Sequence, residues 1–401
     1  MYPLWVKMRI LLFNWRSILS HSAGGAETHC YEIFNRIAEK GNLVQLVASC
    51  DDLTKPERMM IGKIRTLHVN RKEIFYPFSS FLGLRKISFG FFDVIVEDIS
   101  KFPMFWPLLF SKVFSKPFVA IVHHVHGKTL LKELPFPLNA SLYFFELFGL
   151  KLYSLFEPYV VTVSESTKHE LISLGFSEER IKVIPNGLDF KPLSVLSFEK
   201  KSAFPLIVYF GRVKKYKRLD HLIQAAKQVY LEVRNVKIII AGKGDAEVYA
   251  ELHTLANQIG VGDIVKFYGE VDKDERNDVL QKAWVYAIAS MKEGFGISVI
   301  EAQAFGVPVV AYAVPGLIDS VKHLDSGILV KNGAVQNFAD ALIMICRNKM
   351  LREKLSKGAI ENASQYDWAK SADELLRLLT SFSQSRTRLE EDRFKSTPFQ
   401  K

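Results

Sequence analysis

The segment Glu293-Gly-Phe-Gly-Ile-Ser-Val-Ile-Glu301 joins two carboxylates, a pair of glycines and the start of an apolar run. The apolar residues Ile297, Val299 and Ile300 predict a buried helix that begins at the glycines. A helix start presents unpaired backbone N–H groups and the positive end of the helix dipole, which suit a diphosphate. The carboxylates would lie at the helix mouth and about two turns inside it, where they could accept hydrogen bonds from sugar hydroxyls.

This segment therefore favours a site for a sugar carried on a nucleotide. A capped helix with a tight turn and two surface glutamates would have the same sequence. Features elsewhere in the sequence are needed to choose between the two interpretations.

Short apolar strands alternate with amphipathic helices along most of the chain, a pattern typical of parallel α/β sheets. A first series of strands is predicted at Met8–Phe13, Leu43–Ser49, Asp93–Glu97, Phe118–Val122 and Tyr159–Val163. A second series is predicted at Leu206–Phe210, Val236–Ala241, Ile264–Tyr268, Val285–Ala289 and Val309–Tyr312. The pattern predicts an α/β protein with two Rossmann-like doubly wound domains that face each other across a cleft.

The predicted boundary between the two domains follows Asp189. Residues 1–189 form the first domain and residues 190–364 the second, with a linker-like stretch near the start of the second. Residues 384–401 are polar, charged and without periodicity, so they are expected to form a disordered tail.

Composition narrows the class of protein. The apolar fraction of 48% and the charged fraction of 24% are ordinary for a globular protein. The three cysteines have no metal-ligand spacing and fit a reducing, cytoplasmic location. The net charge of +10 is spread over both halves without a basic arm, so nucleic acid is not an expected partner. No segment has the length and composition of a membrane span or a secretory signal.

The stretches 74–92 and 101–156 are rich in Phe, Leu, Tyr and Trp, interleaved with lysine and arginine. Their apolar runs are too short to cross a bilayer. They could be core helices, which is the commoner case, or they could lie against lipid with the basic side chains facing the headgroups.

Other glycines and basic residues stand where predicted strands end. Gly24 and Gly25 lie between the first strand and its helix, where glycine permits close approach of the backbone to a ligand. Gly211 and Arg212 directly follow the first strand of the second domain, and Lys217 stands just before a helix. These cations could neutralise a diphosphate leaving group, although a solvated basic loop would look similar.

Three histidines, His123, His124 and His126, follow a strand of the first domain. Their spacing suggests zinc, but no aspartate or glutamate is suitably placed nearby, so no metal site is predicted. One histidine that hydrogen-bonds a sugar in the cleft is the favoured interpretation, and the sequence leaves open which of the three it is.

These motifs occur together and in one order, with Ser164-Glu165-Ser166 and Pro185-Asn186-Gly187-Leu188-Asp189 between them. The chain resembles the family 4 glycosyltransferases, a retaining group with the two-domain GT-B fold, over roughly residues 8–380. Two positions depart from the family pattern: many members have His-Asp where this chain has His123-His124, and Lys217 is followed by Arg218 rather than the frequent glycine.

The resemblance implies roles for individual residues. Arg212 and Lys217 would hold the diphosphate, Glu293 would contact the hydroxyls of the donor sugar, and Glu301 would contact the ribose. His123 would contact the transferred sugar near the reacting carbon. The remaining donor-binding positions would act through close backbone approach or local packing: Gly24, Gly25, Gly211, Gly294, Phe295, Gly296 and Ile297.

The resemblance also implies the reaction. A hexose-type sugar would move from a nucleotide-diphosphate sugar to a glycan or a polyprenyl- or lipid-linked acceptor, with no metal or other cofactor. The family's last helix crosses back to the first domain, and residues 365–383 would make that crossing. The enzyme would act in the cytoplasm, with peripheral contact at the inner face of the cell membrane through the basic, aromatic first domain.

Two other functions fit part of the sequence. A nucleotide-sugar epimerase on a similar fold would need an acid/base pair around the sugar but no acceptor pocket. A non-catalytic nucleotide-sugar-binding protein could lack any one of the residues named above, so their joint presence disfavours it. The sequence does not identify the base, the sugar, the acceptor or the oligomeric state.

Overall fold

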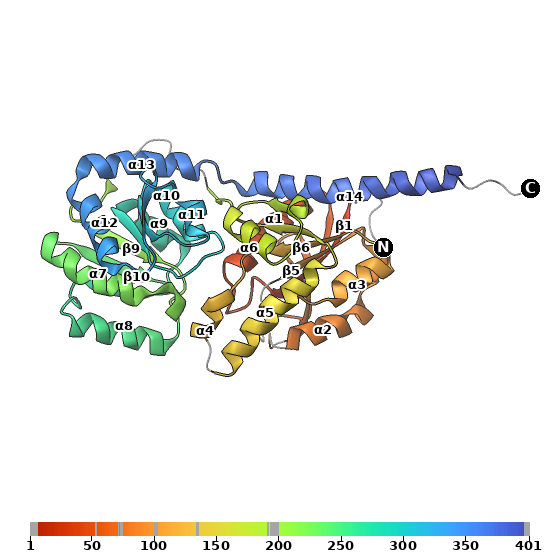
Figure 1. Cartoon of the computed structure of the whole chain (residues 1–401), viewed down its shortest axis with the longest axis horizontal. Coiled ribbons are helices and arrows are strands. Elements are labelled where there is room, and N and C mark those ends of the chain that lie inside the picture. Colours follow the sequence, from red (N-terminus) through yellow and green to blue (C-terminus); the bar gives the residue numbers. More distant parts are fainter. Residues whose placement is uncertain are drawn as a thin grey trace, which may run out of the picture.

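The computed structural model describes residues 7–396 except 53, 71, 73–74, 100–102, 134–135, 191 and 193–199. It contains two separate β-sheets, each covered by helices (Figure 1). The α/β class and the two doubly wound domains expected from the sequence are confirmed. The chain passes from one sheet to the other between β8 (Ile181–Val183) and β9 (Leu206–Phe210).

The first sheet has eight strands in the order β3-β4-β2-β1-β5-β6-β7-β8. All neighbours are parallel except β3 and β4, which form an antiparallel edge. The strands of this sheet before β8 are β1 (Arg9–Arg16), β2 (Leu43–Ser49), β3 (Arg58–Ile61), β4 (Ile64–Asn70), β5 (Val94–Ile99), β6 (Phe118–Val122) and β7 (Tyr159–Thr162). Its helices are α1 (Gly25–Glu39), α2 (Tyr76–Gly83), α3 (Trp106–Val113), α4 (Leu130–Glu133), α5 (Leu138–Ser154) and α6 (Glu165–Ser173).

Alternation along β1 separates the two cores of this domain. Ile10 and Leu12 point into the layer that holds α1, whereas Leu11 and Phe13 point into the layer that holds α2, α3 and α5. Both faces of the sheet are therefore covered, as a parallel sheet requires.

The second sheet has six parallel strands in the order β11-β10-β9-β12-β13-β14. Its strands after β9 are β10 (Lys237–Ala241), β11 (Val265–Gly269), β12 (Val285–Ile288), β13 (Val309–Tyr312) and β14 (Gly327–Val330). Its helices are α7 (Leu219–Glu232), α8 (Ala246–Gln258), α9 (Lys273–Lys282), α10 (Ile297–Ala304), α11 (Leu317–Ser320), α12 (Val335–Arg347) and α13 (Lys349–Ala363).

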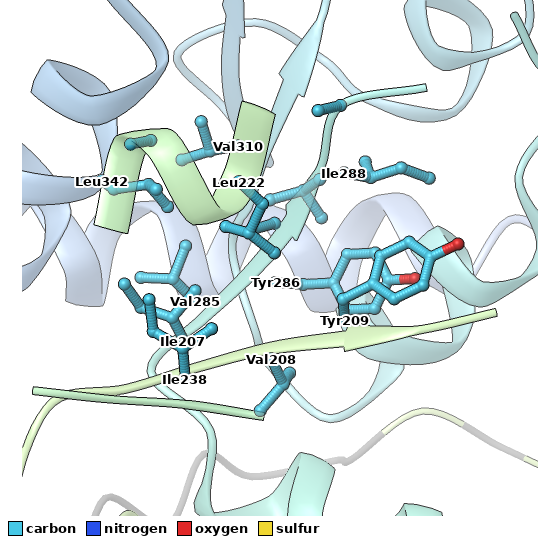
Figure 2. Packing of buried hydrophobic residues seen from close by; sticks show 14 of the residues in the cluster. Ile207, Val208, Tyr209, Leu222, Ile238, Val285, Tyr286, Ile288, Val310 and Leu342 are labelled. Carbon is cyan, nitrogen blue, oxygen red and sulfur yellow. The ribbon is translucent and has the colours of Figure 1, made fainter. Parts of the chain in front are cut away.

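The core of the second domain is built from the central strands and the helices against them. Figure 2 shows apolar side chains of β9, β10, β12 and β13 meeting Leu222 of α7 and Leu342 of α12. Tyr286 also lies in this core, and its hydroxyl donates to the carbonyl of Phe210, at 2.6 Å. This bond fixes the carboxyl end of β9 against β12, where the site described below begins.

The last helix, α14 (Trp368–Ser396), leaves the second domain and lies along the first (Figure 1). Trp368, Ala372, Leu375 and Leu379 are buried in the same core as α1. The structure differs here from the prediction of a disordered tail at 384–401, because the helix continues to Ser396. Once the buried apolar side chains at the start of α14 have fixed its first turns, the helix extends readily through good helix formers such as Gln, Arg, Leu and Glu. Residues 397–401 lie outside the described part of the chain.

The aromatic stretches of the first domain are partly core and partly surface. Tyr76, Phe89, Phe92, Phe118 and Tyr153 are buried. Many of their neighbours are exposed, as described below. Within the described residues, no helix combines the length and apolar character that crossing a bilayer requires.

Candidate functional site

Strand order locates the crevice of the second domain. From β9 the chain continues outward to β10 and β11, whereas β12 lies on the other side of β9 and leads to β13 and β14. Loops that leave the carboxyl ends of β9 and β12 therefore diverge and open a space between them. Arg212 follows β9, and Glu293 with Gly294 and Gly296 follows β12.

The first domain supplies the opposite wall by the same rule. From β1 the chain adds strands toward one edge of the sheet, and from β5 it adds them toward the other edge. β1 and β5 are parallel neighbours at the point where the order changes. Gly24 and Gly25 stand between β1 and α1, and His123 follows β6, the next strand along. Both sets of sequence-predicted residues thus lie at the carboxyl ends of central strands, and the two ends face each other.

A cavity of about 1020 Å³ lies between the two domains. This volume suits a ligand as large as a nucleotide with a sugar attached. Residues from the first domain that line it include Ser20, Ser22, His124, His126 and Thr129. Residues from the second domain include Gly211, Arg212, Tyr216, Lys243, Arg276 and Ser298.

Arg212 is an exposed cation at the wall of this cavity. Its side chain is exposed, and its Nη2 lies 3.4 Å from the hydroxyl of Tyr216. Among the residues that the structure describes, no carboxylate forms an ion pair with it. An unpaired guanidinium with several free N–H groups is well suited to bind a phosphate in bidentate fashion.

Lys217 and Glu293 form a nearly buried ion pair. The Nζ of Lys217 lies 2.5 Å from Oε1 of Glu293, and the two side chains are 10% and 12% exposed. Burial alone would lower the pKa of Lys217, but the adjacent Glu293 carboxylate raises it, so the ammonium stays charged. Lys217, the cation predicted to bind the diphosphate, is thus in direct contact with Glu293, the carboxylate predicted to bind the donor sugar.

Glu301 is also paired, with Arg276 on α9, at 3.0 Å between Oε1 and Nη2. Burial raises the pKa of Glu301, and Arg276 opposes that rise. Helix α10 begins at Ile297, because Gly296 has φ +94° and cannot belong to a right-handed helix. Glu301 therefore lies a little over one turn inside the helix rather than the two turns expected.

His123 is buried, and its Nε2 lies 3.1 Å from Oδ2 of Asp98 at the end of β5. The ring of His29 meets it edge-on, with 4.7 Å between centroids. Burial opposes the charged imidazolium, but Asp98 outweighs it and raises the pKa of His123. Burial in turn raises the pKa of Asp98 against the effect of His123. The hydrogen bond between the two side chains favours the imidazolium–carboxylate form of the pair.

The three histidines have different surroundings. The cavity wall includes His124 and His126, whereas the imidazole of His123 is turned toward Asp98. His126 is held by Glu146 of α5, which accepts from its backbone N–H at 2.7 Å and contacts its Nδ1 at 2.9 Å. Burial and the neighbouring cationic groups lower the pKa of His124 well below its usual value, so that ring is neutral.

Three of the predicted glycines lie where the two domains touch. A Cβ on Gly24 would stand 3.2 Å from Cζ of Arg212, and one on Gly25 would stand 3.5 Å from Ile297. A Cβ on Gly294 would stand only 2.7 Å from the carbonyl oxygen of His123. A side chain at Gly294 would therefore force the two walls apart.

Gly211 and Phe295 contribute in other ways. Gly211 has φ +154°, and a Cβ there would stand 2.9 Å from the hydroxyl of Tyr209. The side chain of Phe295 is buried away from the cavity and meets the ring of Tyr366 at 5.1 Å between centroids. Only the backbone of Phe295 can therefore face a ligand.

Several residues of the site were not predicted from the sequence. Asp98, His29 and Arg276 all contact predicted residues directly. Asp98 lies in β5, which pairs with β6, the strand that His123 follows. This proximity is a signal only once the strand order is known. Within the described ranges, no group of three or more His, Cys, Asp or Glu side chains is arranged to hold a metal ion.

Comparison with known families matches both domains. The family described as Glycosyltransferase Family 4 matches residues 23–191, and the family described as Glycosyl transferases group 1 matches residues 196–362. An uncharacterized glycosyltransferase of Methanocaldococcus jannaschii is 34% identical over 228 residues, which are 54% of this chain and 58% of that protein. A D-inositol 3-phosphate glycosyltransferase of Kribbella flavida is 32% identical over 228 residues, 53% of this chain and 54% of that protein. The match thus spans about half the length of these curated relatives.

Solved structures share the whole two-domain arrangement. Sucrose-phosphate synthase of Thermosynechococcus elongatus has a TM-score of 0.77 at 19% identity, over 94% of this chain and 100% of that chain. Anabaena HepE in complex with UDP and glucose has a TM-score of 0.73 at 20% identity, over 93% and 100%. At these identities the likeness shows the fold alone, and it confirms the GT-B fold expected from the sequence.

Proposed function

Because the chain belongs to the family 4 glycosyltransferases, we propose that it moves a hexose-type sugar from a nucleotide-diphosphate sugar to a glycan or lipid-linked acceptor. The observation that carries this proposal is the exposed, unpaired guanidinium of Arg212 at the wall of a cavity of about 1020 Å³. A doubly charged diphosphate is the ligand that such a cation, beside the start of α10, would bind best.

The reaction breaks the bond between the anomeric carbon and the diphosphate oxygen, and the diphosphate leaves with the electron pair. The acceptor hydroxyl forms the new bond and loses its proton. Arg212, Lys217 and the N–H groups at the start of α10 would stabilise the charge on the leaving group, so no metal is required. The family resemblance supports retention of configuration at the anomeric carbon.

The remaining groups would hold the donor. Glu293 keeps one carboxylate oxygen outside its 2.5 Å contact with Lys217, and that oxygen could accept from a sugar hydroxyl. Glu301, fixed by Arg276, would contact the ribose. His123 would contact the transferred sugar. Asp98 holds its imidazole, and Gly294 lies close to its backbone carbonyl.

The named proteins suggest the first ligands to test. Anabaena HepE was solved with UDP and glucose, which makes UDP and UDP-glucose the first donor candidates. Several relatives are D-inositol 3-phosphate glycosyltransferases, so inositol phosphate is a first soluble acceptor candidate. The enzyme would act in the cytoplasm at the inner face of the cell membrane.

Thermal unfolding with UDP, GDP, ADP and their sugar conjugates, in excess chelator, tests the donor site. A ligand at about 100 times its dissociation constant should stabilise the fold by about 2.7 kcal/mol. The same ligand should give no shift with Arg212→Ala. No shift with any nucleotide, or a shift that appears only after a divalent ion is added, would contradict the proposal.

A further inference from the structure

Large apolar side chains are exposed mainly on one part of the molecule. Of the 24 large apolar side chains exposed in the described residues, fifteen lie between positions 75 and 155. Single exposed apolar residues are normal, but a concentration of this kind marks an interaction surface.

Helix α5 shows the pattern most clearly. Phe144, Phe145, Phe148 and Leu152 are 59%, 58%, 54% and 38% exposed. The rings of Phe144 and Phe148, one turn apart, stack with 5.5 Å between centroids and 7° between planes. The one acidic residue of this helix, Glu146, is buried and points inward. The outer side of α5 is therefore apolar along most of its length.

Helices α2 and α3 lie beside α5 on the same face of the sheet (Figure 1). Phe81 of α2 packs edge-on against Trp106 of α3, and Phe105 at the start of α3 packs against Tyr153 of α5. We call the outer side of these three helices the apolar face. Its exposed side chains are Phe78, Phe81, Leu82, Leu109, Val113, Leu138, Phe144, Phe145, Phe148 and Leu152.

The exposed charges on the three helices themselves have one sign, whereas the exposed Glu57 and Glu157 near their ends are paired with Lys86 and Arg180. Lys112 on α3, Lys151 on α5 and Arg85 just after α2 are exposed. Within the described side chains of α2, α3 and α5, no acidic group is exposed, because Glu146 is the only acid and it is buried. Basic side chains beside exposed aromatic rings are the composition of surfaces that bind anionic lipid.

We infer that the apolar face docks on the surface of an anionic phospholipid bilayer, with its phenylalanines in the headgroup–acyl boundary and its lysines on the phosphates. A second copy of the chain fits this surface poorly, since self-association would bring the same unpaired cations together. A bilayer with anionic headgroups supplies both the apolar layer and the opposite charge.

The apolar face is joined to the catalytic cleft by Glu146. This residue of α5 accepts from the backbone N–H groups of His126 and Gly127, both at 2.7 Å. His126 lines the cavity, so the helix on the membrane and one wall of the cleft form a connected unit. If the proposed function holds, an acceptor carried on a lipid would reach the cleft past His126 without leaving the bilayer.

Vesicle cosedimentation of the full chain tests the docking. Wild type should bind vesicles of phosphatidylglycerol and phosphatidylcholine, and bind pure phosphatidylcholine less strongly. The double variant Phe144→Ser/Phe148→Ser should lower the partition coefficient by about tenfold or more, because two exposed aromatic anchors are removed. Lys151→Glu should weaken binding to the anionic vesicles selectively.

A matched control comes from the second domain. Tyr230 and Leu231 on α7 are 50% and 76% exposed, so Tyr230→Ser/Leu231→Ser removes comparable apolar surface elsewhere. The control should bind vesicles like wild type. Equal loss in both double variants, or no binding by wild type, would overturn the docking proposal. The proposal would also be overturned if sedimentation velocity showed a wild-type dimer that dissociates only in Phe144→Ser/Phe148→Ser.

The thermal shift with donor nucleotide is measured on the same preparations. Exposed side chains contribute little to stability, so both double variants should unfold at the wild-type temperature and keep the nucleotide shift. A retained shift with lost vesicle binding separates this inference from the donor site. An absent shift in wild type would instead contradict the proposed function and leave the vesicle result to stand alone.

Discussion

The two domains share one sheet plan but present different surfaces. The second domain has its unpaired cation, Arg212, at the cleft, and few large apolar side chains on its outer helices. The first domain has a buried ion pair of His123 with Asp98 at the cleft, and it has an apolar outer face. The sheet order fixes where a ligand can bind, whereas the outer side of each helix is free to vary with the partner it meets.

The same contrast appears inside the cleft. Arg212 of the second-domain wall is an exposed cation with no acidic partner among the described residues. On the first-domain wall the cation Arg16 is already paired with Glu27, and His124 is neutral. A charged leaving group would therefore bind on one side and an uncharged hydroxyl group on the other. The following variants test this division.

Arg212→Ala should have the largest effect of the changes considered. Removing one preorganised cation that faces a developing charge costs about 100- to 1000-fold in turnover. The side chain is exposed, so the unfolding temperature of the free protein should stay close to that of wild type. Steady-state kinetics with the donor identified by thermal shift measure the effect.

The matched control for Arg212 is Lys215→Ala, three positions along. Lys215 is exposed, pairs with Glu251 and is not among the residues that line the cavity. Its removal should leave turnover within about twofold, as expected of a surface ion pair. An unchanged rate in Arg212→Ala would remove this residue from the reaction and would weaken the division between the two walls.

Glu293→Gln should have the next largest effect, and it acts on stability as well as on turnover. The change leaves Lys217 nearly buried without its carboxylate, which costs about 3–5 kcal/mol of unfolding free energy. Burial would then lower the pKa of Lys217, so the loss should shrink as pH rises and the ammonium deprotonates. Urea unfolding at two pH values measures this change.

The Lys217→Met/Glu293→Gln double variant separates the pair from its single groups. Removing both charges should recover part of the stability lost in Glu293→Gln, because no buried charge stays unpaired. Turnover should not recover, since the lysine proposed to bind the diphosphate has been removed. Recovery of turnover in the double variant would show that the pair is purely structural.

The fold was predictable because its signals are local. Strands such as Leu206–Phe210 and Val309–Tyr312 are short apolar runs, and the structure has them at the same residues. The helix of residues 384–396 was not predicted, because its extension beyond residue 383 depends on α14 already being docked through Trp368 and Leu375. Periodicity in the segment itself does not report that docking.

The site was predictable only in part, because its residues are joined across domains. Glycines and cations after strands mark a ligand site in the sequence, and Arg212 and Gly24 do lie together. The partners that set their charge states come from elsewhere in the chain, as Arg276 does for Glu301. Those pairings follow from strand order and domain approach, which a single sequence does not contain. The roles assigned to the individual residues stay predictions until they are tested.

Asp98→Asn should have the smallest effect, and its pH dependence is the informative part. Asp98 raises the pKa of His123 in the folded state above its ordinary value of about 6.5. A raised histidine pKa adds stability that is fully present below about pH 6.5 and is lost as pH rises through the folded value. The difference in unfolding free energy between wild type and Asp98→Asn should therefore be largest in acid, about 1 kcal/mol, and smaller at alkaline pH.

The His123→Gln background gives this measurement its control. Without the imidazole, Asp98→Asn should lose the component of its effect that grows as pH falls through neutrality, so the coupling energy of the double-mutant cycle should fall toward zero at high pH. A coupling energy that stays constant with pH would mean that His123 is neutral beside Asp98. In that case the first-domain wall would carry no positive charge from this residue, and the contrast with Arg212 across the cleft would be sharper still.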